Sequence, residues 1–424
     1  MPGPTVRLRR AAAIVLAVAL GGVLTAAAAP ALAATPALPA CATQLPLPGT
    51  LGAPGKAKPQ LLPAPSSTVG GDALRLPGLQ VAVPAGRPRP PVVPSAAWMI
   101  ADLRTGEVIA SCNAHVPFPP ASTLKMLTAV TVLPHVPDRR VIYTARPEDA
   151  NMEGTRVGLV PGSRYTADDL FHGLMLGSGN DAAHALASYA GGEPAIAARM
   201  QVMARQLGAT DTHVVNASGL DEPGQVSSAY DLALIGRAAV ADPYIAQLTR
   251  TTHYRFPGKG ATFGPERPRF DIQNQNRLLG AYAGMTGVKT GFTTLARSTF
   301  VGTAVRGDRA YLVSVMHSNN GGWRSARDLL NWAFAYGAGA RPVGVLVDGP
   351  PPGDPPSPTL SPSATTTTTG GTAAGGTSAL SPVNHSADGL FTLSRETTVT
   401  LAAALAAFGV AAGLIALKLR RRRS

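Results

Sequence analysis

The chain has 424 residues, 45% hydrophobic and 14% charged, so it is long enough for one or two buried cores and is not a charged disordered protein. Two cysteines exclude a disulfide-dense scaffold and a Cys₄ zinc module. The formal net charge of +13 suggests nucleic-acid binding, but eight positive charges lie at the two ends, in Arg7, Arg9, Arg10, Lys418 and Arg420 to Arg423. We interpret these basic ends as topology signals and predict no nucleic-acid partner.

Residues 1–33 have the pattern of a secretory signal peptide. An apolar run from Ala11 to Ala29 follows the first arginines, and Ala31-Leu32-Ala33 follows that run. A basic start, an apolar stretch and an A-x-A site predict export and cleavage after Ala33 or Ala34. An uncleaved anchor helix is the alternative, and Leu38-Pro39-Ala40-Cys41 loosely resembles a lipidation site.

Two segments rich in proline and glycine flank the middle of the chain. Residues 34–94 include Arg87-Pro88-Arg89-Pro90-Pro91 and predict an extended, disordered arm. Residues 341–396 include Thr365 to Thr369, Pro-Pro-Pro and Gly-Gly pairs, which is typical of a stalk. At up to about 3 Å per residue, such a stalk would hold a domain on the order of 100 Å from a membrane. The sequence therefore places the folded domain at 95–340.

A second apolar segment lies near the end of the chain. Val399 to Leu417 carries no charge and is just long enough to cross a hydrocarbon core of about 30 Å. The basic residues after it favour the cytoplasmic side. We predict a transmembrane helix at 397–418, a cytoplasmic tail at 419–424 and a folded domain on the extracellular, cell-wall side of the cell membrane. A buried globular helix is the alternative.

Between the linkers, the pattern predicts strands at both ends and helices in the middle. Ala97 to Asp102 and Glu107 to Cys112 flank Arg104-Thr105-Gly106 and predict a β-hairpin. Apolar periodicity predicts helices at 122–132, 167–176, 181–189, 193–207, 228–241 and 323–336. Strands are predicted at 285–289, 298–305 and 310–316. This order predicts the α+β class: one antiparallel sheet flanked by helices, with an all-helical lobe.

The first of three short motifs is Ser122-Thr123-Leu124-Lys125. A serine at the start of a helix and a lysine three residues later lie on one helix face. The serine hydroxyl is a weak nucleophile until a base takes its proton, and a lysine amine can do so if burial and nearby cations lower its pKa. The Ser122 backbone N–H at a helix N-terminus would also face an oxyanion. An N-cap serine with a surface lysine is the alternative interpretation.

Ser178-Gly179-Asn180 lies between two predicted helices, so we place it in a loop. There a hydroxyl and a carboxamide could relay a proton and hold a substrate amide. An ordinary helix start, with Asn180 or Asp181 as the N-cap, is the alternative.

Lys289-Thr290-Gly291 belongs to a late strand. Its ammonium and hydroxyl groups would bind an anionic carboxylate, and Gly291 would let a substrate backbone approach closely. A plain lysine at a strand edge is the alternative. Each motif alone is weak evidence for an active site. All three in this order on an exported chain are far more specific evidence.

At these residues the chain resembles the penicillin-recognising serine D-Ala-D-Ala carboxypeptidases, the low-molecular-mass penicillin-binding proteins. The resemblance covers 95–340 and implies a β-lactamase/transpeptidase-like fold. Further segments carry it: Pro120 to Lys125, Leu176 to Ala182, Asn216 to Leu220, Asn274 to Leu279 and Gly287 to Thr293. It departs at Ala296-Arg297, where the family usually has Ala-Gly.

The resemblance implies a role for each motif residue. Ser122 attacks the carbonyl between two D-alanines of a peptidoglycan stem peptide, Lys125 is its base, and Ser178 relays the proton to the leaving amine. Asn180 orients Lys125 and the substrate amide. Lys289 and Thr290 bind the terminal carboxylate beside Gly291, and the N–H groups of Ser122 and Phe292 form the oxyanion hole. Water then cleaves the acyl-enzyme, and β-lactams acylate Ser122 as covalent inhibitors.

Two other functions stay open. A β-lactamase shares these motifs but needs rapid hydrolysis of the acyl-enzyme, in one class through a dedicated glutamate. Glu193 and Glu222 are the acidic candidates after Asn180, and neither has a matching sequence context. The other possibility is a non-catalytic cell-wall-binding module, against which the intact motifs argue.

No cofactor or metal is predicted, because the eight histidines show no ligand spacing such as H-E-x-x-H. The two cysteines, Cys41 and Cys112, both belong to the exported part. A disulfide between them would contribute roughly 4 kcal/mol in the chain-entropy view. Free thiols or a lipidated Cys41 are the alternatives.

Overall fold

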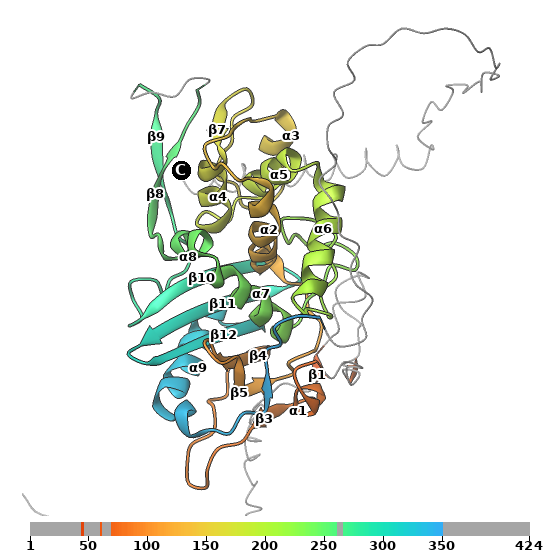
Figure 1. Cartoon of the computed structure of the whole chain (residues 1–424), viewed down its shortest axis with the longest axis vertical. Coiled ribbons are helices and arrows are strands. Elements are labelled where there is room, and N and C mark those ends of the chain that lie inside the picture. Colours follow the sequence, from red (N-terminus) through yellow and green to blue (C-terminus); the bar gives the residue numbers. More distant parts are fainter. Residues whose placement is uncertain (1–43, 46–59, 62–68, 261–265, 351–424) are drawn as a thin grey trace, which may run out of the picture. The chain divides into compact units, whose positions relative to one another are not determined.

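The computed structural model describes residues 44–45, 60–61, 69–260 and 266–350 (Figure 1). The predicted signal peptide at 1–33, the transmembrane segment at 397–418, the tail at 419–424 and Cys41 lie outside the described residues, as does the stalk from residue 351 on. Among the described residues, no helix has both the length and the apolar character needed to span a membrane. The fold below is therefore that of the central part of the chain.

A seven-stranded antiparallel sheet forms the base of this part. Its strands run in the order β10-β11-β12-β4-β5, and both β13 and β3 pair with β5. Their bounds are β3 Leu79–Val81, β4 Ser95–Asp102, β5 Glu107–Cys112, β10 Met285–Thr293, β11 Arg297–Arg306, β12 Arg309–Ser318 and β13 Gly344–Val345. The predicted hairpin is present, and the Asp102 carboxylate accepts the N–H groups of Arg104 and Thr105 in its turn.

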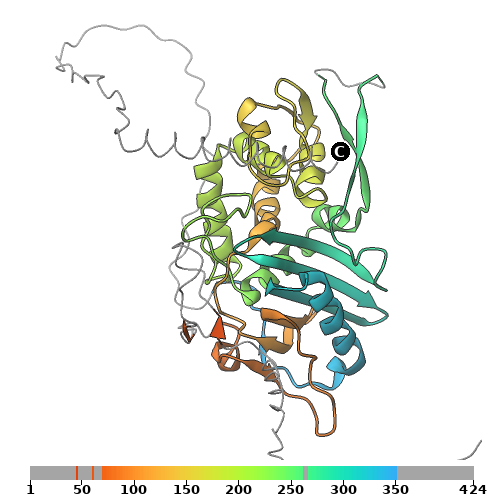
Figure 2. The ribbon, with the colours of Figure 1, turned by 180° about the vertical axis from the view of Figure 1, so that it is seen from behind.

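Both faces of the sheet are covered, so its strands are buried on two sides. Trp98 and Ile100 of β4 belong to one hydrophobic cluster and Met99 and Ala101 to another, because successive side chains of a strand point to opposite faces. The helix α9, Gly322–Tyr336, packs on β11, β12 and β4 (Figure 2). The helix α7, Ala229–Ala241, also contacts these strands. Its buried apolar residues belong to the cluster of Met99 and Ala101, so α7 covers the opposite face of the sheet.

Helices between β5 and β10 form a lobe beside the sheet (Figure 1). They are α2 Lys125–Val132, α3 Pro147–Ala150, α4 Ala167–Met175, α5 Asn180–Tyr189 and α6 Glu193–Gln206. The sequence defines the start of α4 through a capping box, in which the Thr166 hydroxyl accepts the Asp169 N–H and the Asp169 carboxylate accepts the Thr166 N–H. The helix α2 contacts α4, α5 and α6, so the lobe is built around it. The antiparallel sheet with helices confirms the α+β prediction.

Several elements were not predicted. A hairpin of β8 and β9 stands beside the lobe in Figure 1. The bounds of these elements are α1 Asp72–Arg75, β6 Ile142–Thr144, β7 Arg164–Thr166, α8 Pro243–Arg250, β8 His253–Pro257 and β9 Arg269–Gln273. Two short strands, β1 Gln44–Leu45 and β2 Gln60–Leu61, pair with each other.

The ordered region is longer at both ends than the predicted 95–340. Leu74 and Leu346 are each only 1% exposed and belong to the same hydrophobic cluster. The Trp332 indole also donates to the Pro88 carbonyl at 2.9 Å. Residues 69–94 of the arm for which the sequence predicts disorder therefore pack on the domain and extend it.

Candidate active site

Ser122 lies in a tight turn where the chain enters the lobe. Residues Ala121–Leu124 form a 3₁₀ helix that continues into α2 at Lys125. In a 3₁₀ helix residues three apart are eclipsed, so the Lys125 amine lies directly over the serine. Its Nζ is 3.0 Å from the Ser122 Oγ. The predicted pairing of hydroxyl and amine on one face is present, and the tighter turn brings the two groups together.

Two further oxygen atoms hold the Lys125 amine. Its Nζ lies 2.6 Å from the Asn180 Oδ1 and 2.6 Å from the Ser218 carbonyl oxygen. A neutral amine has two N–H donors and one lone pair. Because neither of these oxygens carries a hydrogen, each takes one N–H, and the lone pair is left for the Ser122 hydroxyl. The geometry thus orients Lys125 to accept the serine proton.

The surroundings of Lys125 favour that neutral form. The side chain is 0% exposed, and burial lowers the pKa of its amine well below the usual range. The ammonium of Lys289 lowers the pKa further, whereas Asp181 and Glu193 raise it. Burial is the largest of these effects, so Lys125 can act as a base near neutral pH.

The loop between α4 and α5 carries Ser178 and Asn180. Asn180 is fixed on three sides: its backbone N–H donates to Thr155 O at 2.7 Å, its Nδ2 to Glu153 O at 2.5 Å, and its Oδ1 accepts from Lys125. Ser178 has a left-handed φ of 59°, which costs on the order of 1–2 kcal/mol for a residue other than glycine. The loop prediction is thus supported, although Asn180 is the first residue of α5.

The Asp181 carboxylate holds the segment at residues 157–159, which we call the strap. It accepts the N–H groups of Val157, Gly158 and Leu159 at 2.7–3.0 Å. Three N–H donors satisfy a buried carboxylate and make its negative charge a fixed part of the site. The sequence interpretation considered Asp181 only as a helix cap.

Lys289 on β10 reaches the same loop from the sheet. Its Nζ lies 2.9 Å from the Ser178 Oγ and 2.9 Å from the Thr290 carbonyl oxygen. The side chain is 1% exposed, and burial lowers the pKa of its amine to about 7. The third motif is therefore joined to the second by a hydrogen bond between buried side chains.

Gly291 lies against the turn that carries Ser122. A Cβ atom there would be 2.8 Å from the Ser122 backbone N and would overlap the Thr299 hydroxyl. The Thr299 hydroxyl itself donates to the Pro120 carbonyl at 2.9 Å. Close approach does explain the glycine, as predicted, but the group that approaches is the protein's own nucleophile turn. The backbone of β10 at Gly291 therefore lies close to the Ser122 N–H.

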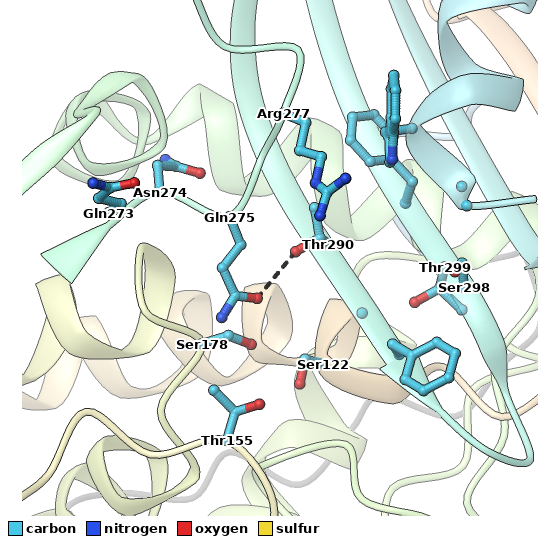
Figure 3. A pocket seen from close by; sticks show the side chains of 16 residues that line it. Ser122, Thr155, Ser178, Gln273, Asn274, Gln275, Arg277, Thr290, Ser298 and Thr299 are labelled. Atoms are coloured by element: carbon cyan, nitrogen blue, oxygen red, sulfur yellow. Dashed lines mark hydrogen bonds between the residues drawn. The ribbon is translucent and has the colours of Figure 1, made fainter.

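A cleft of about 640 Å³ opens onto these groups (Figure 3). Of the predicted residues, Ser122, Ser178, Thr290, Gly291 and Phe292 line it. The other three, Lys125, Asn180 and Lys289, are buried behind its wall. All eight predicted site residues are therefore in one place, divided into a lining layer and a supporting layer.

Sequence reasoning missed several residues of the site. The Ser218 carbonyl contact depends on the backbone path of residues 216–220, a segment recognised only as resembling the family. Gln275 is a second case: its Nε2 donates to the Gly177 carbonyl at 2.9 Å, and its Oε1 lies 3.5 Å from the Thr290 Oγ1 (Figure 3). It thus bridges the loop and the strand across the cleft. Arg277 and Trp323 also line the cleft.

Arg297, the departure from the family pattern, has a left-handed φ of 57° and an exposed side chain. Glycine adopts this conformation without strain, which explains the glycine usual in the family. The side chain of Arg297 does not line the cleft.

Cys112 ends β5 and is fully buried. It is disulfide-bonded. Its predicted partner, Cys41, lies outside the described residues, so their pairing stays a prediction.

Among the described residues, one group has metal-ligand chemistry: His115, Asp211 and Asp231, whose ligand atoms lie within 4.8 Å of one another. None of the three lines the cleft. The His115 Nδ1 is 2.7 Å from the Asp211 Oδ2, and its Nε2 is 3.0 Å from the Val69 carbonyl oxygen. Both ring nitrogens of His115 therefore have hydrogen-bond partners within the protein.

A serine hydroxyl 3.0 Å from a buried lysine amine, with a second buried lysine on an antiparallel sheet, is the arrangement expected of a serine hydrolase of the penicillin-binding type. A sequence model of the D-alanyl-D-alanine carboxypeptidase family, peptidase S11, matches residues 85–320. The chain belongs to this family of serine peptidases.

Curated relatives agree with this assignment. D-alanyl-D-alanine carboxypeptidase DacB2 of Mycobacterium tuberculosis is 42% identical over 259 residues, which are 59% of this chain and 86% of the relative. DacD of Salmonella typhimurium, also a D-alanyl-D-alanine carboxypeptidase, is 35% identical over 58% of this chain. The aligned part is 64% of DacD, so this chain spans less than two thirds of that relative.

Solved structures share the fold. A crystal structure of a D-alanyl-D-alanine carboxypeptidase from Mycobacterium tuberculosis H37Rv has a TM-score of 0.57 and 41% identity, covering 62% of this chain and 99% of that one. The Streptomyces K15 DD-transpeptidase has a TM-score of 0.56 and 25% identity, covering 58% of this chain and all of that one (100%). The central part of the chain therefore has the penicillin-binding-protein fold.

Proposed function

We propose that this serine peptidase removes the terminal D-alanine from peptidoglycan stem peptides through an acyl-enzyme on Ser122. The observation that supports this most directly is the Lys125 amine, which is buried, held by two carbonyl oxygens and 3.0 Å from the Ser122 hydroxyl. That arrangement activates one hydroxyl and needs no histidine. The names of the relatives supply the substrate class.

In the acylation step, the Ser122 Oγ bonds to the carbonyl carbon between the two D-alanines while its proton moves to the Lys125 Nζ. The negative charge develops on the carbonyl oxygen, which the N–H groups of Ser122 and Phe292 would stabilise. Ser178, hydrogen-bonded to Lys289, relays a proton to the amine of the leaving D-alanine. Water then attacks the ester and releases the shortened peptide and the free serine.

Substrate orientation falls to the strand side of the cleft. The buried Lys289 ammonium and the Thr290 hydroxyl would bind the terminal carboxylate. The substrate would thereby give the buried cation an anionic partner, which lowers the free energy of its burial. The same groups would bind the carboxylate of a β-lactam, so we expect penicillins to acylate Ser122. No cofactor or metal takes part in these steps.

We also propose that the catalytic domain acts outside the cell membrane. The sequence patterns at 1–33 and 397–418 support export followed by a C-terminal anchor, with the stalk from 341 to 396 between domain and membrane. A substrate in the cell wall fits this arrangement. Cys41 paired with Cys112 would fasten the N-terminal arm to β5 in an oxidising compartment.

The decisive experiment incubates the purified full chain with a peptide ending in D-Ala-D-Ala and measures free D-alanine, with Ser122→Ala as the inactive match. We expect release by the wild type only, together with covalent labelling by fluorescent penicillin that Ser122→Ala abolishes. A wild-type protein that is not labelled would be a wall-binding module. Rapid multiple turnover of nitrocefin would instead identify a β-lactamase.

A further inference from the structure

A short turn at residues 216–220 lies behind the Lys125 amine. It supplies the Ser218 carbonyl oxygen, 2.6 Å from the Nζ, as one of the two fixed acceptors. If this oxygen moved, an N–H of Lys125 would lose its partner and the lone pair would no longer be aimed at Ser122. What fixes the turn therefore also orients the base.

Besides Lys125, three side chains contact the backbone of residues 217–219 in the middle of the turn, and Gln225 holds its two ends at Asn216 and Leu220. The Asn216 Oδ1 accepts the N–H groups of Ser218 and Gly219 at 3.1 and 2.8 Å, and the Thr128 hydroxyl donates to the Ala217 carbonyl at 2.6 Å. The third is Glu193, whose Oε2 accepts the Ala217 N–H at 3.2 Å. Of these three side chains, Glu193 is the charged one.

Glu193 is the first residue of α6, where the positive end of the helix dipole stabilises a carboxylate. Burial raises its pKa, whereas the hydrogen bond from Ala217 and the charges of His184 and Lys125 lower it. His184 is itself paired with the Asp149 carboxylate at 2.6 Å. The negative charge of Glu193 thus has partners on α5 and α2.

The charges that act on the Lys125 amine come from three directions. Lys289 on β10 lowers its pKa, and Asp181 on α5 and Glu193 on α6 raise it. Asp181 is already occupied by the three N–H groups of the strap at 157–159. Glu193 is therefore the acidic group that does two things. Its charge raises the pKa of Lys125, and its hydrogen bond to Ala217 helps to fix the Ser218 carbonyl that accepts from Lys125.

We propose that Glu193 is a positioning residue for acylation: its carboxylate holds the turn that carries the Ser218 carbonyl and places a negative charge behind the Lys125 amine. The inference rests on the proposed function, because it concerns the base of that reaction. It assigns Glu193 a task different from the deacylating glutamate of some β-lactamases. The Glu193 carboxylate supports the base and does not activate water.

The test measures the rate of acylation by fluorescent penicillin against pH in the full chain, for the wild type, Glu193→Gln, Glu193→Ala and Glu222→Gln. Glu193→Gln keeps an oxygen for the Ala217 N–H but loses the charge that raises the Lys125 pKa. In the plot of acylation rate against pH, the rise on the acid side (the acid limb) should therefore move to lower pH by about 0.5–1 unit. The maximal rate at the plateau should stay within about twofold of the wild type. Glu193→Ala also loses the acceptor, and its plateau rate should fall about 10-fold or more.

Glu222→Gln is the matched control, because Glu222 is an exposed carboxylate beside the same turn and does not act on Lys125. Its profile should match the wild type. Two results would overturn the inference. In the first, the acid side of the rate–pH profile of Glu193→Gln coincides with that of the wild type. In the second, Glu222→Gln shifts that side of the profile as much as Glu193→Gln does. Should Glu193→Ala fail to fold, the Glu193→Gln profile decides alone.

The two proposals fail in distinguishable ways. A wild type that penicillin does not label refutes the proposed function, whereas a labelled wild type with an unmoved Glu193→Gln profile refutes only the role of Glu193. NMR titration of the lysine side chains gives a readout without activity, since the chain has only six lysines. Glu193→Gln should lower the pKa of the Lys125 amine relative to the wild type there as well.

Discussion

The Lys289 Nζ lies 2.9 Å from the Ser178 Oγ, which joins the sheet to the loop between α4 and α5 across the cleft. This bond places the buried Lys289 amine at the same loop whose Asn180 holds the Lys125 amine. Burial lowers the pKa of both amines, and the charge of Lys289 lowers the pKa of Lys125 further, so we expect Lys125 to lose its proton at a lower pH than Lys289.

The pH dependence of kcat/KM should be bell-shaped. Activity rises with pH as Lys125 loses its proton, and it falls as Lys289 loses the charge that binds the substrate carboxylate. A lysine whose pKa is lowered to about 7 is charged only below that pH, so the alkaline limb should begin near pH 7. Steady-state kinetics on a D-Ala-D-Ala peptide from pH 5 to about pH 9 measure this. A kcat/KM that still rises at the upper end contradicts it.

Replacing Lys289 should alter the base as well as the substrate contact. Lys289→Met removes the positive charge that lowers the Lys125 pKa, so the acid limb of penicillin acylation should move to higher pH. The lost charged hydrogen bond, worth about 1.5–3 kcal/mol, should reduce kcat/KM for the peptide by about 10–100-fold.

Two matched variants separate these effects. Lys289→Arg keeps the charge, so its acid limb should stay near that of the wild type. Lys259→Met removes an exposed lysine of equal charge outside the cleft and should leave both the limb and the rate unchanged. An unmoved limb in Lys289→Met would show that the two amines are not coupled.

Gly291→Ala should disable the enzyme without direct loss of any functional group. The added methyl would overlap the Thr299 hydroxyl and lie 2.8 Å from the Ser122 backbone N, so β10 must move away from the nucleophile turn. A displacement of about 1 Å can reduce a rate about 100-fold, and we expect a loss of that order in penicillin acylation. Gly339→Ala, where no atom lies within 4 Å of the new methyl, is the control and should acylate like the wild type.

Arg297→Gly should stabilise the fold. A left-handed conformation costs on the order of 1–2 kcal/mol at a residue other than glycine, and the extra chain entropy of glycine offsets about 0.5–1 kcal/mol of the gain. We expect a net gain of about 0.5–1 kcal/mol, visible as a small rise in Tm. Arg297→Ala removes the same side chain but keeps the strain, so it should bring no such rise. Equal shifts in both variants would trace the effect to the guanidinium group.

The central sheet could be predicted because its strands are short apolar runs bounded by turns. In β5 every residue after Glu107 is buried, and a turn with Gly106 closes the hairpin. The hairpin of β8 and β9 gave no such signal, because most of its side chains are at least partly exposed and Pro257 ends β8. Its pairing comes from packing against the lobe, which a local pattern does not encode.

The site was predictable where chemistry lies in side chains and unpredictable where it lies in the backbone. Ser122, Lys125 and Lys289 belong to residue types and spacings that already indicate a nucleophile, a base and an anion site. The Ser218 carbonyl has no residue-type signal, since every residue carries the same group. The contact of Glu193 with Ala217 likewise depends on how α6 meets a distant turn. Such contacts follow only from the folded path of the chain.

Two residues beside the nucleophile, Ala121 with a φ of 49° and Ser178, adopt backbone conformations that glycine would tolerate better. Each conformation costs on the order of 1–2 kcal/mol, which the surrounding packing must offset. An engineer who sought heat resistance would choose these positions first and would gain it by substituting glycine. At Ala121 the substitution would loosen the turn that holds the Ser122 hydroxyl, and at Ser178 it would remove the hydroxyl that pairs with Lys289. In this enzyme, durability and turnover compete at the same two positions in the chain.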